Sequence, residues 1–178
     1  NAPTSIPAHE NHDFISICAC FDHSLGLRND GTVFGWGLND YEQLSIPPHE
    51  NHDFVQIVTS ADFSLGLRRD KTIFGWGHSW IRNPIQRACL IPPSTENHDF
   101  VMIAACPAGL RSDGTIFVWK STMYSPRTIP SSENHDFIEI TAGESWLVGL
   151  RRDGTVLGWN DPTRVVSYEN PPPHENRD

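Results

Sequence analysis

Hydrophobic positions along the chain fall into three short stretches separated by polar turns, and this set of stretches recurs four times. In the first copy they are residues 14–18, 24–28 and 32–36, in which Phe, Ile, Leu and Val predominate. Short runs of such residues bounded by turn residues are typical of β-strands. No segment keeps the period of an amphipathic helix, so the pattern predicts an all-β chain.

A polar pentad, Glu-Asn-His-Asp-Phe, marks the start of each copy. It occupies residues 10–14, 50–54, 96–100 and 133–137, and a partial copy, Glu-Asn-Arg-Asp, occupies residues 175–178. An Ile-Pro pair comes before each full pentad, and the Ile residues of successive pairs lie 40, 45 and 38 residues apart. A period close to 40–45 residues is typical of one propeller blade.

The repeats predict a single domain over residues 1–178. The approximate units are 6–45, 46–90, 91–128 and 129–170, and residues 171–178 begin a further one. A small antiparallel sheet cannot bury its apolar face alone, whereas sheets stacked around an axis can. We therefore predict a β-propeller or partial propeller of about four blade-like repeats, with a linear stack as the alternative.

Three arrangements of these repeats stay open. The chain could be a fragment of a longer repeat protein cut in register, a complete four-bladed ring, or one of two chains that complete a larger ring. Within each unit, Asn29-Asp30-Gly31 predicts a tight two-residue hairpin in which Gly supplies a positive φ. Copy two has Lys71 at the glycine position, which predicts a strained turn or another turn type.

One segment resembles a known repeat family. Residues 23–44 read HSLGLRNDGTVFGWGLNDYEQL. This string is similar to the regulator of chromosome condensation repeat, whose consensus runs His-Ser-Leu-Ala-Leu, then Asp-Gly, then Trp-Gly-x-Asn-x-x-Gly-Gln-Leu. Glu42 stands where the consensus has Gly, and copy three lacks the His-Ser-Leu portion. The Ile-Pro and Asp-Phe linkage looks like that of divergent secreted or bacterial-type members, such as the propeller-shaped β-lactamase inhibitory protein.

The resemblance implies a propeller fold, but it does not transfer an activity, because this architecture carries unrelated functions. Propellers of this family usually have seven blades, whereas the chain has about four repeats. A tryptophan closes each unit, and its strict spacing predicts packing within or between blades. These residues are Trp36, Trp76, Trp119 and Trp159.

Net charge narrows the classes of partner. The chain carries 13 Lys and Arg against 22 Asp and Glu, which gives a formal net charge of −9. This balance argues against a nucleic-acid partner and against an anionic membrane surface. No apolar run approaches the length of a transmembrane helix. The four cysteines do not decide the redox compartment, so localisation stays open.

Histidines of the pentad are the obvious candidates for metal binding. His9 with His12, and His49 with His52, have His-x-x-His spacing beside carboxylates. The full pair occurs in only two copies, which favours a structural role in the turn, and we predict neither a metal site nor a cofactor. No Ser-His-Asp set, Cys-His pair or phosphate-binding loop stands out, so we predict no catalytic centre.

Irregular loops after the tryptophans are the best candidates for specificity. Loops on a rigid scaffold often carry binding residues, and Trp, Tyr and Arg are enriched in hot spots. We therefore predict a non-enzymatic module that presents such loops to a protein partner, with contacts from Trp80, Arg82, Arg87 and Tyr124. The alternatives are a structural, self-assembling part of a larger propeller and a regulator resembling a guanine-nucleotide exchange factor.

Overall fold

The computed structural model of the chain describes residues 5–61, 63–77, 91–105, 107–119, 129–143 and 146–160. These residues form four antiparallel sheets of three strands each, with no helix among them. We call the sheets blades 1 to 4. Blade 1 contains β1 (Phe14–Cys20), β2 (His23–Arg28) and β3 (Val33–Gly37); blade 2 contains β4 (Phe54–Thr59), β5 (Phe63–Arg68) and β6 (Ile73–Gly77); blade 3 contains β7 (Phe100–Ala104), β8 (Ala108–Arg111) and β9 (Ile116–Val118); blade 4 contains β10 (Phe137–Ala142), β11 (Trp146–Arg151) and β12 (Val156–Asn160).

This architecture confirms the all-β fold and the partial propeller of about four blades. The pentad Phe opens the first strand of every blade, as the apolar pattern predicts. Strands pair in chain order within each sheet, so each blade is a three-stranded meander in the described residues. The three strands of each blade correspond to the three apolar stretches of each repeat.

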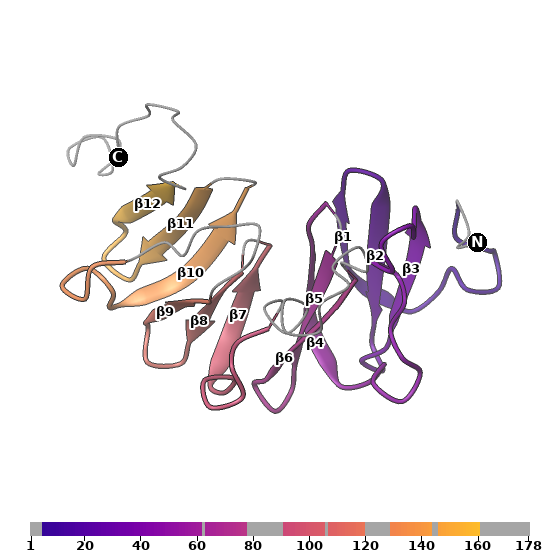
Figure 1. Cartoon of the computed structure of the whole chain (residues 1–178), viewed down its shortest axis with the longest axis horizontal. Helices are drawn as coiled ribbons and strands as arrows, with labels where there is room; N and C mark the ends of the chain where they lie inside the picture. The colour runs from indigo at the N-terminus through magenta and orange to yellow at the C-terminus, as the bar shows by residue number, and fades with distance from the viewer. Residues whose placement is uncertain are drawn as a thin grey trace.

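Blades lie side by side in chain order, from β1–β3 at one end to β10–β12 at the other (Figure 1). The first strands of successive blades contact one another, β1 with β4, β4 with β7 and β7 with β10. These first strands are therefore the inner strands of the arc, and the third strands β3, β6, β9 and β12 lie at its outside.

The hydrophobic core lies between blades rather than within one of them. Blade 1 contributes the buried side chains of Leu25, Leu27 and Val33, and blade 2 packs Phe54, Ile57 and Trp76 against them. The same two kinds of surface meet between blades 2 and 3 and between blades 3 and 4. We call the surface with the pentad Phe and the tryptophan the leading face, and the surface equivalent to Leu25, Leu27 and Val33 the trailing face.

Two of the repeat tryptophans confirm the packing prediction. Trp76 and Trp119 are buried in the interfaces that blades 2 and 3 make with their preceding blades. The Trp76 ring lies 5.8 Å from the Phe54 ring, centroid to centroid. The pentad Phe and the repeat Trp form such a ring pair in every blade. Two residues that recur once per repeat therefore pack together on the leading face.

The turn between the second and third strands is longer than predicted. Arg28 N donates to Thr32 O at 2.8 Å, and Gly31 N donates to Arg28 O at 3.0 Å. The loop therefore has three residues, a tight turn followed by Gly31 at φ 83°, and the two-residue prediction is wrong. Lys71 adopts φ 70° at the same position of copy two, so this copy keeps the turn type and holds a side chain in the left-handed region.

Candidate functional site

Two residues of the pentad, its Asn and its Phe, join neighbouring blades. The side chain of Asn51 accepts a hydrogen bond from Val33 N at 2.8 Å and donates one to Val33 O at 3.0 Å. Phe54 N also donates to Gly31 O at 3.0 Å. Asn97 and Asn134 make the equivalent pairs of bonds to the outer strands of blades 2 and 3. We call this two-bond contact the Asn clasp.

The pentad glutamate anchors its own blade. Arg68 forms an ion pair with Glu50 and donates to the Glu50 carbonyl at 3.0 Å. The Arg68 guanidinium also lies over the rings of Phe54 and Phe74, 5.4 Å and 4.8 Å from their centroids. The hydrogen bond from Arg68 is the main reason that the pKa of Glu50 lies below its ordinary value of 4.5. Charge and aromatic packing therefore fix the start of the inner strand together.

The histidines of the pentad lie at the surface beside its aspartates. His52 Nδ1 lies 2.8 Å from Asp53 Oδ2, and the other three copies have the same exposed pair. Asp53 has a φ of 60°, so the local hydrogen bond accompanies a tight change of chain direction. In the stretches that the structure covers, no three His, Cys, Asp or Glu side chains are placed to hold a metal ion.

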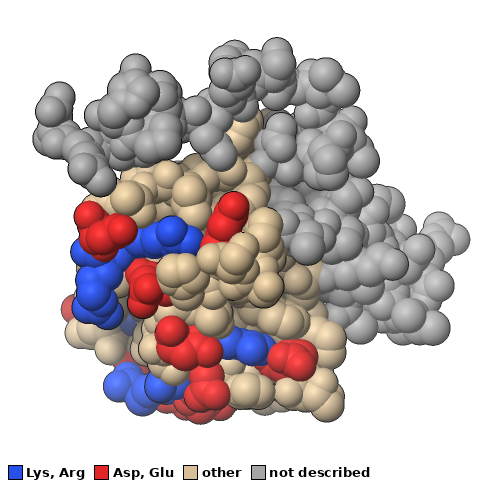
Figure 2. Space-filling model, turned by 90° about the vertical axis from the view of Figure 1, so that its left-hand side faces the viewer, with Lys and Arg blue, Asp and Glu red and all other residues tan. Residues whose placement is uncertain are grey.

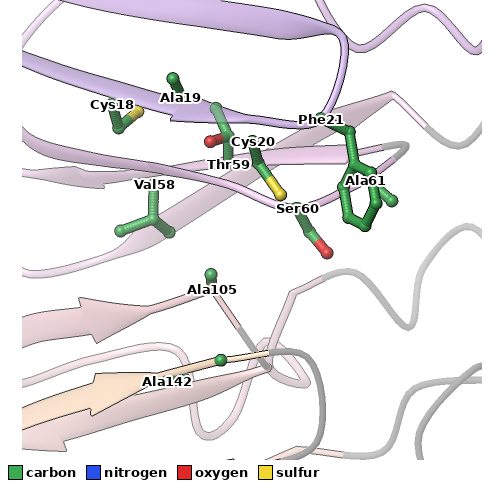
Figure 3. Close-up of a pocket in the computed structure, with 11 residues that line it drawn as sticks. Cys18, Ala19, Cys20, Phe21, Val58, Thr59, Ser60, Ala61, Ala105 and Ala142 are labelled. Atoms are coloured by element: carbon green, nitrogen blue, oxygen red, sulfur yellow. The ribbon is translucent and has the colours of Figure 1, made fainter.

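The pentad residues have structural contacts, so the candidate site lies elsewhere. It is a cavity at the C-terminal ends of the inner strands. It has a volume of about 280 Å³, and all four blades line it. Blade 1 contributes residues 18–21 and blade 2 residues 58–61, while Ala105, Ala142 and Gly143 come from blades 3 and 4. Figure 3 shows the labelled residues of blades 1 and 2 on one side of the open space and Ala105 and Ala142 on the other.

The walls of this cavity are small and uncharged. None of the described residues that line it is a carboxylate, an imidazole, a lysine or an arginine. Burial raises the pKa of the Cys18 thiol to about 11, so this thiol stays protonated near neutral pH and is a weak nucleophile. Cys18 and Cys20 are thiols in the structure. Cys106, which occupies the repeat position of Cys20, lies outside the described residues.

Phe21 is the most unusual residue of the cavity. Its side chain is 69% exposed, although it is a large aromatic group. Its φ is 48°, a conformation that bulky side chains rarely adopt. It lies in the two-residue turn that joins β1 to β2, where Cys20 pairs with His23. In the sequence, Phe21 differs from its counterpart in copy two, which is Ala61. This difference marks Phe21 as an irregular position of the repeat, but only the structure shows that its side chain lines the cavity.

A buried polar network joins blades 1 and 2 nearby. His23 Nε2 lies 3.2 Å from Ser64 Oγ, and Ser64 Oγ donates to Gln43 O at 2.9 Å. All three residues are buried, so a substrate cannot reach the His–Ser pair and its role is structural. His23 and Gln43 belong to the family-like string, but the sequence did not reveal that His23 reaches the serine of the next copy.

The four predicted binding residues cannot be placed. Trp80, Arg82, Arg87 and Tyr124 lie outside the described residues, so their role stays a prediction. Figure 2 views the molecule from the side where blade 4 lies, and acidic and basic side chains lie close together there around uncharged surface. Among the residues with described structure, none belongs to a helix with the length and apolar character needed to cross a bilayer.

Comparison with known proteins finds a family match for one segment of the chain. Residues 14–43 match the family model of the regulator of chromosome condensation (RCC1) repeat. This segment contains the inner strand of blade 1, the His23 strand, the Trp36 strand and Gln43. A comparison with curated protein sequences found no significant match.

Solved structures share the fold at low sequence identity. Prp20p from Saccharomyces cerevisiae is 16% identical with a TM-score of 0.64, over 87% of this chain and 47% of that one. Human WBSCR16 is 22% identical with a TM-score of 0.60, over 85% and 49%. The ectodomain of the Physcomitrella patens receptor kinase CR4 is 21% identical with a TM-score of 0.64, over 86% and 42%. The chain thus spans just under half the length of each, and it folds as a partial β-propeller of about four blades, in which residues 14–43 match the RCC1 repeat.

Proposed function

We propose that the chain is a non-enzymatic protein-interaction module whose central cavity receives an apolar side chain of a protein partner. The observation that carries this proposal is Phe21, an exposed aromatic ring at positive φ beside a cavity that all four blades line. Aromatic residues, Phe among them, are enriched at protein interfaces relative to the rest of the surface. Backbone strain of this kind persists mainly at functional positions.

The chemistry of the cavity favours binding over catalysis. Its described walls supply alanines, a valine, hydroxyl groups and thiols, with no charged group to hold a phosphate or to transfer a proton. The volume of about 280 Å³ is close to the lower end of ligand pockets, which suits one inserted side chain. A hydrophobic side chain from a partner would pack between Phe21 and the alanines opposite.

Similar structures support a protein as the class of partner. Prp20p is described by its binding to Gsp1p and histones, and yeast RCC1 (Prp20) has been solved bound to Kap60. The present chain covers 47% of the first protein and 45% of the second, so their partners are not assigned to it. What carries over to the proposal is that propellers of this kind present surfaces to other proteins.

The test is a peptide selection on the purified chain. Peptides selected from a displayed random library would be measured by titration calorimetry against the wild type and Phe21→Ala. We expect Phe21→Ala to weaken binding at least about tenfold, equivalent to ~1.4 kcal/mol. Tyr41→Ala is the matched control, because Tyr41 is also an exposed aromatic residue but does not line the cavity.

A second variant approaches the cavity from the opposite side. Ala142→Leu should fill part of the space and weaken the same peptides, while the melting temperatures of all variants stay near that of the wild type. If the selected peptides bind Phe21→Ala and Ala142→Leu as tightly as the wild type, the cavity is not the binding site.

A further inference from the structure

A set of exposed aliphatic side chains recurs along the inner strands. The residue that follows the pentad Phe is a β-branched aliphatic residue in every copy, and its exposed fraction is 44–64%. These residues are Ile15, Val55, Val101 and Ile138. Each takes the same place at the start of β1, β4, β7 or β10, and the blades lie side by side in chain order (Figure 1). We call this set the aliphatic row.

The backbone sets each member of the row apart from the strand ladder. The pairing of β4 with β5 shifts register between Phe54 and Gln56, and the inner strands of the other three blades shift at the same point. Such a shift is a β-bulge, in which the extra residue has no partner across the ladder. Bulges often occur beside functional sites, because they change the direction of a side chain. The row thus depends on a backbone feature that all four blades share.

Neither burial nor strand propensity explains why these positions are always aliphatic. The residue that comes next along the strand varies in character between copies. It is Ser16, Gln56, Met102 or Glu139. Threonine also favours strands, but it occurs at none of the four row positions. Exposed aliphatic groups that gather in one place and are bordered by polar groups mark interaction sites.

Carboxylates border the row at this end of the blades. Each pentad supplies a Glu and an Asp, and the turn between the second and third strands supplies another Asp, so four blades supply twelve carboxylates. This turn lies against the pentad of its own blade, since Arg69 N donates to Asp53 O at 2.9 Å. Seven cations of the described residues lie at the same end, which leaves an excess of five negative charges. They are Arg28, Arg68, Arg69, Lys71, Arg111, Arg151 and Arg152.

The pentad aspartates can accept further hydrogen bonds. The Asp53 side chain is 60% exposed, and it precedes Val55 by two residues. His52 Nδ1 lies 2.8 Å from Asp53 Oδ2, and none of the described residues donates to Asp53 Oδ1. An exposed carboxylate with one open oxygen favours Lys or Arg as a partner.

We propose that the aliphatic row and the pentad aspartates beside it form a second interaction surface, which binds a basic segment of another protein. Aliphatic residues on one side of that segment pack on the row, and its Lys or Arg side chains lie against the aspartates. The row is at the N-terminal ends of the inner strands, whereas the cavity is at their C-terminal ends. The two surfaces are therefore separate, and each can be tested while the other stays intact.

The test is the binding of a synthetic amphipathic helix, with leucines on one face and lysines on the other, to the full chain. Titration calorimetry should show binding that weakens as the salt concentration rises. The double variant Val55→Thr, Val101→Thr should raise the dissociation constant at least about tenfold, because the contact would then bury two hydroxyl groups without partners. Threonine keeps the branched shape and the strand preference of valine, so the melting temperature should stay near that of the wild type.

Leu38→Thr is the matched control. Leu38 is also an exposed aliphatic residue, but it lies at the other end of blade 1, where Leu38 N donates to Asp22 O at 2.8 Å. This substitution should leave the dissociation constant unchanged.

A second pair of substitutions tests the charges. Asp53→Asn with Asp99→Asn should make binding less dependent on salt, because fewer ion pairs form with the lysines. Asparagine tolerates the positive φ of these two positions, 60° and 63°, so the turns should stay folded. A helix with glutamates in place of the lysines should not bind.

Four results would overturn the proposal. They are no binding of the leucine–lysine helix, equal binding by the double threonine variant, equal binding of the glutamate helix, and a loss in Phe21→Ala as large as that in the threonine variant, which would place the helix in the cavity. The mass of the chain alone is measured first by light scattering. Self-association that the threonine variant abolishes would assign the row to a second copy of the chain instead.

Discussion

Substitution of Gly66 by alanine tests how the repeat is packed. A Cβ atom at this position would lie 2.4 Å from two carbon atoms of the Phe54 ring. This ring cannot move aside easily, because it is buried and lies between the rings of Phe74 and Trp76 and the guanidinium of Arg68. The absence of a side chain at Gly66 therefore provides the space that the Phe54 ring occupies.

The magnitude follows from two opposing effects. Forcing an extra methyl group into a packed core costs about 1–3 kcal/mol. Alanine is favoured over glycine within a strand by roughly 0.5–1 kcal/mol, because glycine loses more backbone entropy on folding. The net loss in the free energy of unfolding is therefore about 1–2 kcal/mol. For a chain of this size, that loss corresponds to a fall in melting temperature of roughly 2–8 °C.

The assay is urea denaturation followed by tryptophan fluorescence, with Gly143→Ala as the matched control. A Cβ on Gly143 would meet no atom within 4 Å, so this variant should be as stable as the wild type. Phe54→Leu frees space over Gly66, so the double variant should lose less stability than the two single losses added together. A Gly66→Ala chain as stable as the wild type, or strictly additive losses, would refute the packing argument.

Three further changes test other contacts. Lys71→Gly should raise the free energy of unfolding by about 0.5–1 kcal/mol in urea denaturation, because glycine accepts φ 70° without strain; a loss would contradict this. Asn97→Ala removes both bonds of one Asn clasp and should lower the same free energy by about 1–3 kcal/mol, whereas no change would mean that water replaces the clasp. The pKa of Glu50 is lowered in the folded chain by Arg68, so its stabilising effect is present above pH 4.5 and is lost as the pH falls through the folded pKa. Melting temperatures from pH 7 to pH 3 should therefore fall less in Glu50→Gln than in the wild type, and parallel curves would argue against the ion pair.

The sequence predicted the blades well because each blade depends on local patterns. Strand propensity, the Asp-Gly turns and the repeat period all act within about 40 residues, and all four sheets follow them. The turn length was wrong because the signal Asn29-Asp30-Gly31 fits a two-residue or a three-residue loop. Only the bond from Arg28 N to Thr32 O distinguishes the two.

Features that depend on which side chains meet, within a blade or between blades, were not predictable in the same way. The contact of Phe54 with Gly66 has a counterpart in the sequence, because every copy has both a pentad Phe and a glycine in its second strand. The recurrence of both residues does not by itself show that they are in contact. The central cavity depends on the angle between blades, which no local pattern encodes. The four loop residues that we predicted for partner binding remain a sequence prediction.

The Asn clasp has a consequence for aggregation. Among the described residues, the third strand of each blade is an edge strand, and the outward N–H and C=O groups of such a strand can pair with a strand from another molecule. The clasp occupies both backbone groups of Val33, Ile73 and Ile116, the first residues of three such strands. At each of these three edges one amide side chain thus occupies a backbone N–H and C=O pair, and its loss would leave that pair open to a strand from another molecule.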